Sequence, residues 1–135
     1  MSYDLIKNKI ISRLNSLGYS EGTSTTLEAL SANEYGSCFI IKPLSGEMQD
    51  ETLHTKFYDE QEWQIQLPFV HSSNNDLANL SQLHRSKDAI IKDLDNPTNW
   101  ANTVRIQKYK SWDVIETPNY YVLNIKIKII DEYIY

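Results

Sequence analysis

The closing segment, residues 120–135, constrains the fold most, because apolar and polar side chains alternate along it. The apolar set is Tyr121, Leu123, Ile125, Ile127 and Ile129, and the polar set is Asn124, Lys126 and Lys128. A period of two predicts a β-strand with one set on each face. At roughly 3.3 Å per residue, about twelve residues of this segment in a strand reach about 40 Å. We expect its apolar face to be covered and its polar face to be open to water or to another subunit.

Two other segments carry apolar residues at intervals of three or four, the spacing of a helix with one apolar face. The first spans Tyr3 to Leu17 and is followed by Gly18, which can adopt the left-handed conformation that ends a helix. The second begins after a cap at Asn75 or Asp76 and stops at the DNP sequence of residues 95–97. Their apolar stripes are Ile6, Ile10, Leu14 and Leu17, and Leu77, Leu80, Leu83, Ile90 and Leu94.

Three further segments predict strands. Ser37–Lys42 is rich in β-branched and aromatic residues, and Pro43 is expected to end it because proline has no N–H for the ladder. Thr55–Phe69 recovers an alternating pattern, so these two strands form a long hairpin with an extended tip. Val104–Ile115 is the third segment.

The alternation slips at two places in these strands, which predicts a β-bulge or a broken strand at the first and a kink or a β-bulge at the second. One lies near Asp59 and Glu60, and the other lies near Lys110 and Ser111. The order of elements is helix, strand, strand, helix, strand, strand. We therefore predict a single α+β domain over residues 1–135, with a mainly antiparallel four-stranded sheet and both helices packed on one face.

Charge and composition exclude several classes of protein. The 13 Lys and Arg against 18 Asp and Glu give a formal charge of −5, which disfavours binding to duplex nucleic acid through its phosphates. No segment approaches the roughly 20 apolar residues that span a bilayer. The charged amino-terminal residues do not resemble a signal peptide, so we expect a soluble chain without membrane contact. The lone Cys38 is consistent with a reducing compartment.

No motif for catalysis, metal binding or nucleotide binding is present in the sequence. His54, His71 and His84 have no spacing that would form a metal site, and we expect them to contact water. The acidic residues between 47 and 62 lack the pattern of a calcium loop. We therefore expect no enzyme activity, no catalytic residue, no metal and no organic cofactor.

Five segments follow one another in the order of the predicted elements: DLIKNKIISRL, CFIIKPLSGE, WQIQLPF, HRSKDAIIKDLDNPTNW and YYVLNIKIKIIDEY. In this organisation the chain resembles the tail-terminator, or tail-completion, proteins of long-tailed bacteriophages. The resemblance covers nearly the whole sequence and is carried by the arrangement of segments, with no catalytic signature.

The resemblance implies a structural protein of the virion, assembled in the host cytoplasm and located at the head-proximal end of the tail. Such a protein forms a ring, commonly a hexamer, that stops polymerisation of the tail tube and offers the surface to which the head attaches. Its partners would be copies of itself, the tail tube protein and head–tail connector proteins. DNA would pass through the lumen without specific binding, as the acidic charge also suggests.

By the same resemblance, the hairpin tip from Ser45 to Asp59 would contact the tube or a neighbouring subunit, and the last strand would form part of the sheet around the lumen. Ring closure needs two different patches that meet on neighbouring subunits. The candidate interface residues are Glu47, Asp50, Glu51, Asp59, Lys126, Lys128 and Tyr133.

Three alternatives remain open at this point. Another head–tail joining component, such as a stopper or a head-completion protein, would have a similar size and composition. A small enzyme would use His71 or His84 with a nearby carboxylate. A host-directed binding protein, for example a phage inhibitor of a bacterial enzyme, would be a stable monomer.

Overall fold

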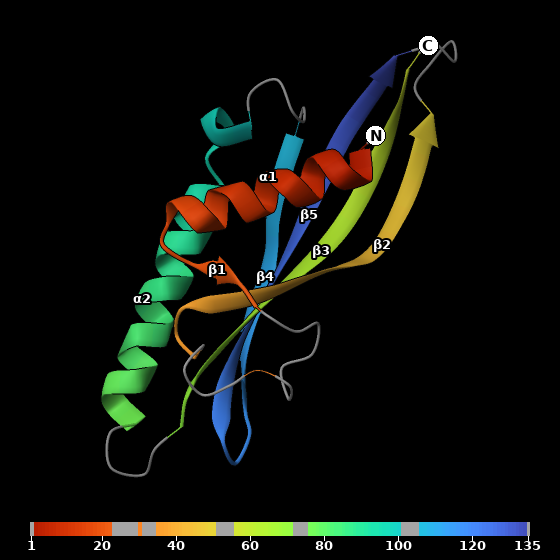
Figure 1. The fold of residues 1–135 in the computed structure, drawn as a ribbon. Coiled ribbons are helices and arrows are strands. Elements are labelled where there is room, and N and C mark those ends of the chain that lie inside the picture. Colours follow the sequence, from red (N-terminus) through yellow and green to blue (C-terminus); the bar gives the residue numbers. More distant parts are fainter. Residues whose placement is uncertain are drawn as a thin grey trace.

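A computed structural model describes the backbone of residues 2–22, 30, 35–50, 56–71, 76–100 and 106–134. Side chains are described for residues 4–22, 30, 35–44, 61–71, 77–96, 98–100 and 111–129. Within these ranges the helices α1 (Ser2–Ser16) and α2 (Asp76–Leu94) lie against one twisted sheet, and part of that sheet continues past α1 toward the carboxyl terminus (Figure 1). The α+β class predicted from the sequence is confirmed.

The first helix, α1 (Ser2–Ser16), forms where the apolar stripe predicts it. Ile6, Ile10 and Leu14 are fully buried. Gly18 has a φ of 96°, and the backbone N–H of Tyr19 donates to the carbonyl of Leu14. The left-handed glycine therefore ends the helix as the sequence indicates.

The second helix, α2 (Asp76–Leu94), is also confirmed, and Asn96 lies outside it as expected. A short 3-10 helix, η4 (Pro97–Trp100), follows, and the side-chain oxygen of Asn96 accepts a hydrogen bond from the backbone N–H of Thr98. Leu77 departs from the expected stripe, because it is 84% exposed. The buried stripe of α2 thus consists of Leu83, Ile90 and Leu94.

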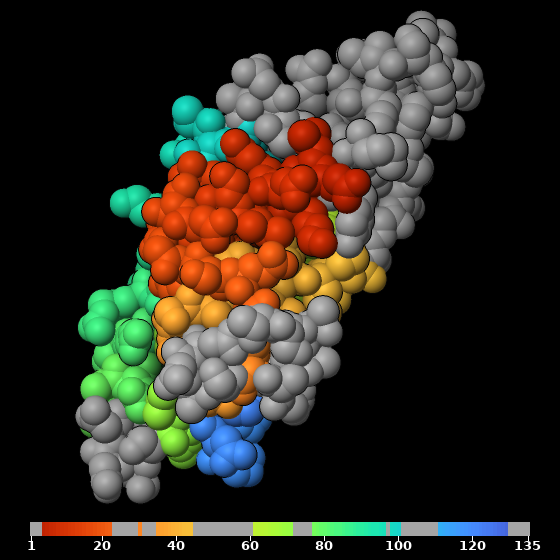
Figure 2. Space-filling view, in the orientation of Figure 1, coloured from red at the N-terminus to blue at the C-terminus, as the bar shows by residue number. Residues whose placement is uncertain are grey.

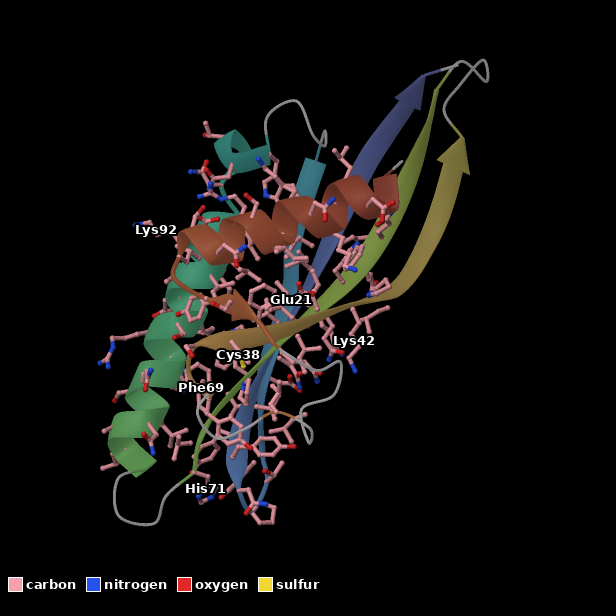
Figure 3. The ribbon with its side chains drawn as sticks, viewed as in Figure 1. Glu21, Cys38, Lys42, Phe69, His71 and Lys92 are labelled. Carbon is pink, nitrogen blue, oxygen red and sulfur yellow. The ribbon has the colours of Figure 1, made fainter. Side chains whose placement is uncertain are left out.

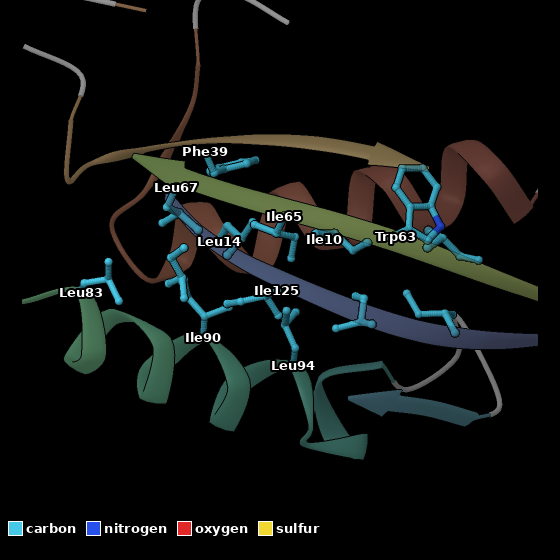
Figure 4. Packing of buried hydrophobic residues seen from close by; sticks show 14 of the residues in the cluster. Ile10, Leu14, Phe39, Trp63, Ile65, Leu67, Leu83, Ile90, Leu94 and Ile125 are labelled. Atoms are coloured by element: carbon cyan, nitrogen blue, oxygen red, sulfur yellow. The ribbon is translucent and has the colours of Figure 1, made fainter. Parts of the chain in front are cut away.

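Both helices bury their apolar stripes on the same face of the sheet (Figure 4). The alternating residues of the last strand, predicted to face inward, are buried in this cluster. Trp63 is fully buried there, and its ring N–H donates to the side-chain oxygen of Gln61 at 2.9 Å. The strand residues in the cluster are Phe39, Trp63, Ile65, Leu67, Phe69, Tyr121, Leu123, Ile125, Ile127 and Ile129.

The sheet has five strands in the order β1-β2-β3-β5-β4. These are β1 (Ser20–Glu21), β2 (Cys38–Asp50), β3 (Lys56–Val70), β4 (Ile106–Glu116) and β5 (Tyr120–Ile134). Neighbouring strands are antiparallel except for β1, which pairs parallel with β2. The prediction of a four-stranded antiparallel sheet was therefore wrong: the sheet is five-stranded and mixed.

The missed strand, β1, has only two residues, and both are polar and exposed. Such a segment carries no β-branched or alternating pattern, so its sequence gives no strand signal. It is held by backbone bonds from Ser20 N–H to the Ser37 carbonyl and from Gly22 N–H to the Phe39 carbonyl. An added Cβ at Gly22 would lie 3.3 Å from that same carbonyl oxygen, which explains why glycine follows the strand.

Pro43 does not end the first long strand, which was the second wrong prediction. β2 continues to Asp50, and Pro43 pairs with Trp63 next to a register shift between Pro43 and Ser45. Proline is tolerated at edge positions and bulges, because no ladder hydrogen bond is lost there. The hairpin is therefore paired much further than expected, up to Asp50 opposite Phe57.

The two predicted bulges had different outcomes. In β4 the register shifts between Tyr109 and Ser111, so the predicted bulge around Lys110 is confirmed. No shift occurs at Asp59 or Glu60, and the bulge predicted there was wrong. The register shift between β2 and β3 lies instead at Leu44 of β2.

The sheet face opposite the helices is covered only in part. Leu30, Cys38, Ile40, Tyr120 and Val122 form a second, smaller buried cluster on it, with Tyr35 packed against them. Further along the strands this face becomes polar: Lys42 is exposed, and Lys126 and Lys128 are half-buried. We call this polar part the open face. The expectation of a wholly uncovered face was therefore wrong at the part of the sheet that carries this second cluster.

Candidate assembly surface

The acidic residues singled out from the sequence lie in the extended part of the β2–β3–β5 sheet. Glu47 and Asp50 belong to β2, and Asp59 belongs to β3, whereas Glu51 lies outside the described residues. Ser45 to Asp50 is therefore paired strand, and the expected hairpin tip from Ser45 to Asp59 is shorter than predicted. The register brings residues from three strands into one row, with Asp50 opposite Phe57 and Phe57 opposite Tyr133.

Acidic residues occupy opposed register positions at two places in this extended part. Glu47 of β2 is in register with Glu60 of β3, and Asp59 of β3 is in register with Asp131 of β5. The segment Ser45–Asp50 is here called the acidic edge, and its place on β2 makes it a candidate contact.

The opposite edge of the sheet has the opposite charge. The segment Ile106–Ser111 of β4, here called the basic edge, contains Lys108 and Lys110. Lys108 is in register with Lys128 of β5. Neither Lys108 nor Lys110 was among the predicted interface residues, because the sequence does not show that this segment forms the far edge of the sheet.

The two charged edges lie at the same level of the sheet. Lys128 is directly opposite Glu62 on one side and Lys108 on the other, and Glu62 is opposite Ser45. One row of the sheet therefore runs from the start of the acidic edge to the middle of the basic edge. Among the described strands, β2 beyond Phe39 pairs only with β3, and β4 pairs only with β5.

The predicted interface residues Lys126 and Lys128 lie between these edges. Lys126 is opposite Gln64, and both residues are half-buried on the open face. Next to them Asn124 is only 3% exposed, and its side-chain oxygen accepts hydrogen bonds from Gln66 at 2.9 Å and Gln64 at 3.3 Å. In Figure 3, Lys42 lies on β2 clear of the helical layer. The open face thus combines amide groups with lysines.

The second half of β4 presents apolar side chains beside its unpaired edge. Trp112 is 39% exposed and Ile115 is 46% exposed. The indole of Trp112 is fixed by its neighbours on α2, since Lys87 Nζ lies 4.3 Å from a ring centroid and His84 packs edge to face at 5.7 Å. A partly exposed tryptophan in a fixed orientation is typical of the residues that contribute most to protein interfaces.

The histidines have three different environments. His54 lies outside the described residues, and His84 is exposed on α2. His71 is not simply in contact with water, as the sequence had suggested. Its Nε2 lies 2.7 Å from Glu116 Oε2, and its ring stacks on Tyr121 with centroids 4.5 Å apart. This pair links the end of β3 to the β4–β5 hairpin, near the lower end of the molecule in Figure 3.

An ion pair between the helices stabilises the layer that covers the sheet. Arg13 of α1 donates two hydrogen bonds to Asp93 of α2, from Nε at 2.9 Å and from a terminal nitrogen at 2.6 Å. The hydrogen bond to Asp93 raises the pKa of Arg13 above its ordinary value. In Figure 2 the surface of α1 lies across the molecule beside that of α2.

The described part of the chain contains neither a cluster of metal ligands nor a membrane-spanning helix. No group of three or more His, Cys, Asp or Glu side chains is placed to hold a metal ion there. None of the helices described is long and apolar enough to cross a membrane.

Comparison with known proteins gives no relative. The sequence matches no protein-family model, and no curated protein is significantly similar to it. The geometry of the surfaces described above is therefore the observation that bears on function.

Proposed function

We propose that the chain is a structural phage protein of the tail-terminator type, which acts by assembling into a ring at the head-proximal end of the tail tube. The observation that carries this proposal is the open sheet: the described helices cover one face, and among the described strands one side of β2 beyond Phe39 and one side of β4 have no strand partner. An exposed strand edge is a template for pairing with another chain. A protein with two different open edges can add copies of itself head to tail.

Ring formation of this kind requires a heterologous interface, in which one patch meets a different patch on the next copy. β2 and β4 satisfy this condition because they differ in sequence and lie at opposite sides of one sheet. The extension of β2, β3 and β5 past α1 provides a projecting surface for a further partner, which on this proposal is the tail tube (Figure 1). The formal charge of −5 would limit adhesion of DNA in the lumen.

The proposal is tested by adding the purified chain to tail tube protein during polymerisation and measuring tube length by electron microscopy. We expect rings at one end of the tubes and shorter tubes as the chain is added. Binding to portal complexes without any effect on tube length would indicate a connector or stopper instead. A stable monomer that captures one host enzyme would indicate the host-directed class.

A small enzyme is a second candidate, and the contact between His71 and Glu116 is the observation that favours it. A carboxylate that orients an imidazole is a common arrangement for general acid–base catalysis. Glu116 is 66% exposed at its side chain, so the pair lies at the surface. If replacement of His54, His71 and His84 abolished a measured activity while assembly remained intact, the structural proposal would have to be abandoned.

A further inference from the structure

We infer that two copies of the chain pair through the outer side of β4, residues 111–116, in a two-fold dimer with one continuous sheet. This segment is here called the β4 edge. The inference goes beyond the proposed function and does not depend on it. Three features support it: the direction of the backbone groups along the β4 edge, the register that joins two such edges, and the side chains that meet there.

The backbone groups of every second residue on the β4 edge point away from β5. The turn between β4 and β5 is closed by a hydrogen bond from the Thr117 N–H to the Tyr120 carbonyl, so these two residues form a hydrogen-bonded pair. In an antiparallel ladder such pairs alternate with pairs whose N–H and C=O groups point outward. Counted from this turn along the register, Trp112, Val114 and Glu116 therefore present both groups at the β4 edge.

The same alternation is confirmed at the other side of the sheet. Carried through the registers of β5, β3 and β2, it predicts that the carbonyl of Phe39 points outward. The N–H of Gly22 donates to that carbonyl at 2.8 Å from outside the β2–β3 pair. Among the described strands, β4 has no such partner at its outer side. An edge of this kind is a template for pairing with another chain.

One register of a two-fold dimer pairs all of the outward residues. A two-fold axis perpendicular to the sheet at Val114 places the β4 edge of a second copy antiparallel to the first, as an isologous contact requires. Val114 then lies opposite Val114 of the partner subunit, and Trp112 lies opposite Glu116 of the partner subunit. Each of these pairs exchanges two N–H···O=C bonds, so every outward group on the β4 edge gains a partner.

The neighbouring registers are worse. An axis at Asp113 sets this residue directly opposite Asp113 of the partner subunit, and directly opposed like charges destabilise a sheet. An axis at Ile115 sets Trp112 opposite Pro118 of the partner subunit, which lies in the turn and has no N–H for a ladder. With the axis at Val114, Asp113 and Asp113 of the partner subunit are only diagonal neighbours, roughly 7–8 Å apart at exposed positions.

The side chains that meet in this register are complementary. Trp112 and Glu116 face the helix side of the sheet, since their register partners on β5 belong to the core under the helices. Trp112 is 39% exposed, and Lys87, which also contacts Asp88, has its Nζ 4.3 Å from the indole centroid. Glu116 of the partner subunit therefore arrives beside an apolar ring that carries a positive charge. The two-fold axis makes this contact twice.

The dimer uses the same side of β4 that a head-to-tail ring would use, so one copy cannot make both contacts at once. Within the dimer the β4 edge is closed, which protects it against the addition of foreign strands. The dimer is therefore the form of the chain away from a tail tube, and it has to separate before copies join in a ring.

Matched proline substitutions test the contact. Val114→Pro removes one outward N–H from each copy, and the ladder with β5 loses no hydrogen bond because this N–H points away from it. Two lost hydrogen bonds, each worth about tenfold in affinity, should weaken dimerisation by about a hundredfold. Ile41→Pro is the control, since Ile41 is also partly buried against the core and presents its N–H at the outer side of β2. It should leave the dimer Kd unchanged.

The Kd values are measured by analytical ultracentrifugation, and circular dichroism confirms that the variants are folded. Two further measurements do not depend on proline. Asp113→Asn removes the diagonal pair of like charges and should tighten the dimer by about threefold. In the unmodified chain, hydrogen exchange followed by NMR should show protection of the Trp112, Val114 and Glu116 amides that grows with protein concentration. The Ile41 amide should exchange equally at every concentration.

The possible failures are distinguishable. The inference is wrong if both proline variants, or neither, weaken the dimer while folded, or if the Ile41 amide gains the protection instead. If Val114→Pro does not fold, the exchange measurement and Asp113→Asn decide. A chain that forms rings on tail tubes but never dimerises overturns this inference and leaves the proposed function standing. A dimer without any effect on tube length does the reverse, and a monomer at every concentration overturns both.

Discussion

The ion pair between Arg13 and Asp93 gives the sharpest stability prediction. It joins the last turn of α1 to the last turn of α2 through two hydrogen bonds, and the side chains of Arg13 and Asp93 are 25% and 10% exposed. Hydrogen bonds to charged groups contribute about 1.5–3 kcal/mol each when protected, and partial exposure reduces this. We expect Arg13→Met to cost about 2 kcal/mol, because it leaves the Asp93 carboxylate without its partner.

The corresponding change in melting temperature follows from the size of the chain. At about 2.1 cal/mol/K per residue, a chain of 135 residues has an unfolding entropy of roughly 0.28 kcal/mol/K. A loss of about 2 kcal/mol therefore lowers Tm by about 7 °C. The pKa of Arg13 is raised in the folded state, so the ion pair contributes its full stability at pH values below the ordinary arginine pKa. This stability is lost as the pH rises through the raised pKa of the folded state.

A double-mutant cycle with Arg13→Met and Asp93→Asn measures the pair itself by thermal or urea unfolding. We expect a coupling energy of about 1–2 kcal/mol. Asp88→Asn is the matched control, since it makes the same chemical change on α2 at a side chain that is 74% exposed, and it should change stability by less than about 0.5 kcal/mol. Equal effects of Asp88→Asn and Asp93→Asn would refute the argument.

Two further predictions concern the sheet and the end of α1. Ile125→Asp should prevent soluble folding because it buries an unpaired charge in the core, whereas Lys126→Glu on the open face should fold. Equal solubility of the two variants would contradict the assignment of the buried and open faces of β5. Gly18→Ala should lower the free energy of unfolding by about 1 kcal/mol, because a φ of 96° is unfavourable for alanine. No steric clash adds to this cost, since no atom lies within 4 Å of an added Cβ. Gly18→Asn should cost less in the same unfolding measurement, since asparagine tolerates this conformation.

The elements that follow from local spacing could be predicted from the sequence. Ile6, Ile10 and Leu14 lie on one helical face whatever the tertiary context, and the alternation along β5 requires one buried face. Both signals depend on the nearest few residues. The helices, the presence of the four long strands and the α+β class were accordingly correct, whereas the predicted end of β2 was not.

The errors arose where tertiary contacts overrule local preference. Two exposed residues, Ser20 and Glu21, become a strand only because β2 lies beside them. Pro43 is accommodated because β2 is an edge strand with a bulge at that point. A single sequence does not show which strand will be at the edge of a sheet.

The candidate surface was predictable only in part. The acidic character of the hairpin is visible in the sequence, and Glu47 and Asp50 were singled out for it. The complementary basic edge, with Lys108 and Lys110, depends on the strand order β3-β5-β4. That order is set by the packing of the whole sheet, so the opposition of the two charged edges appears only in three dimensions.

The most direct test of the account is the mass of the purified, unmodified chain, measured by native mass spectrometry over a range of protein concentrations. The account predicts one closed assembly whose mass is a fixed multiple of the chain mass. A monomer at every concentration would contradict it, and so would a series of open chains without a preferred size.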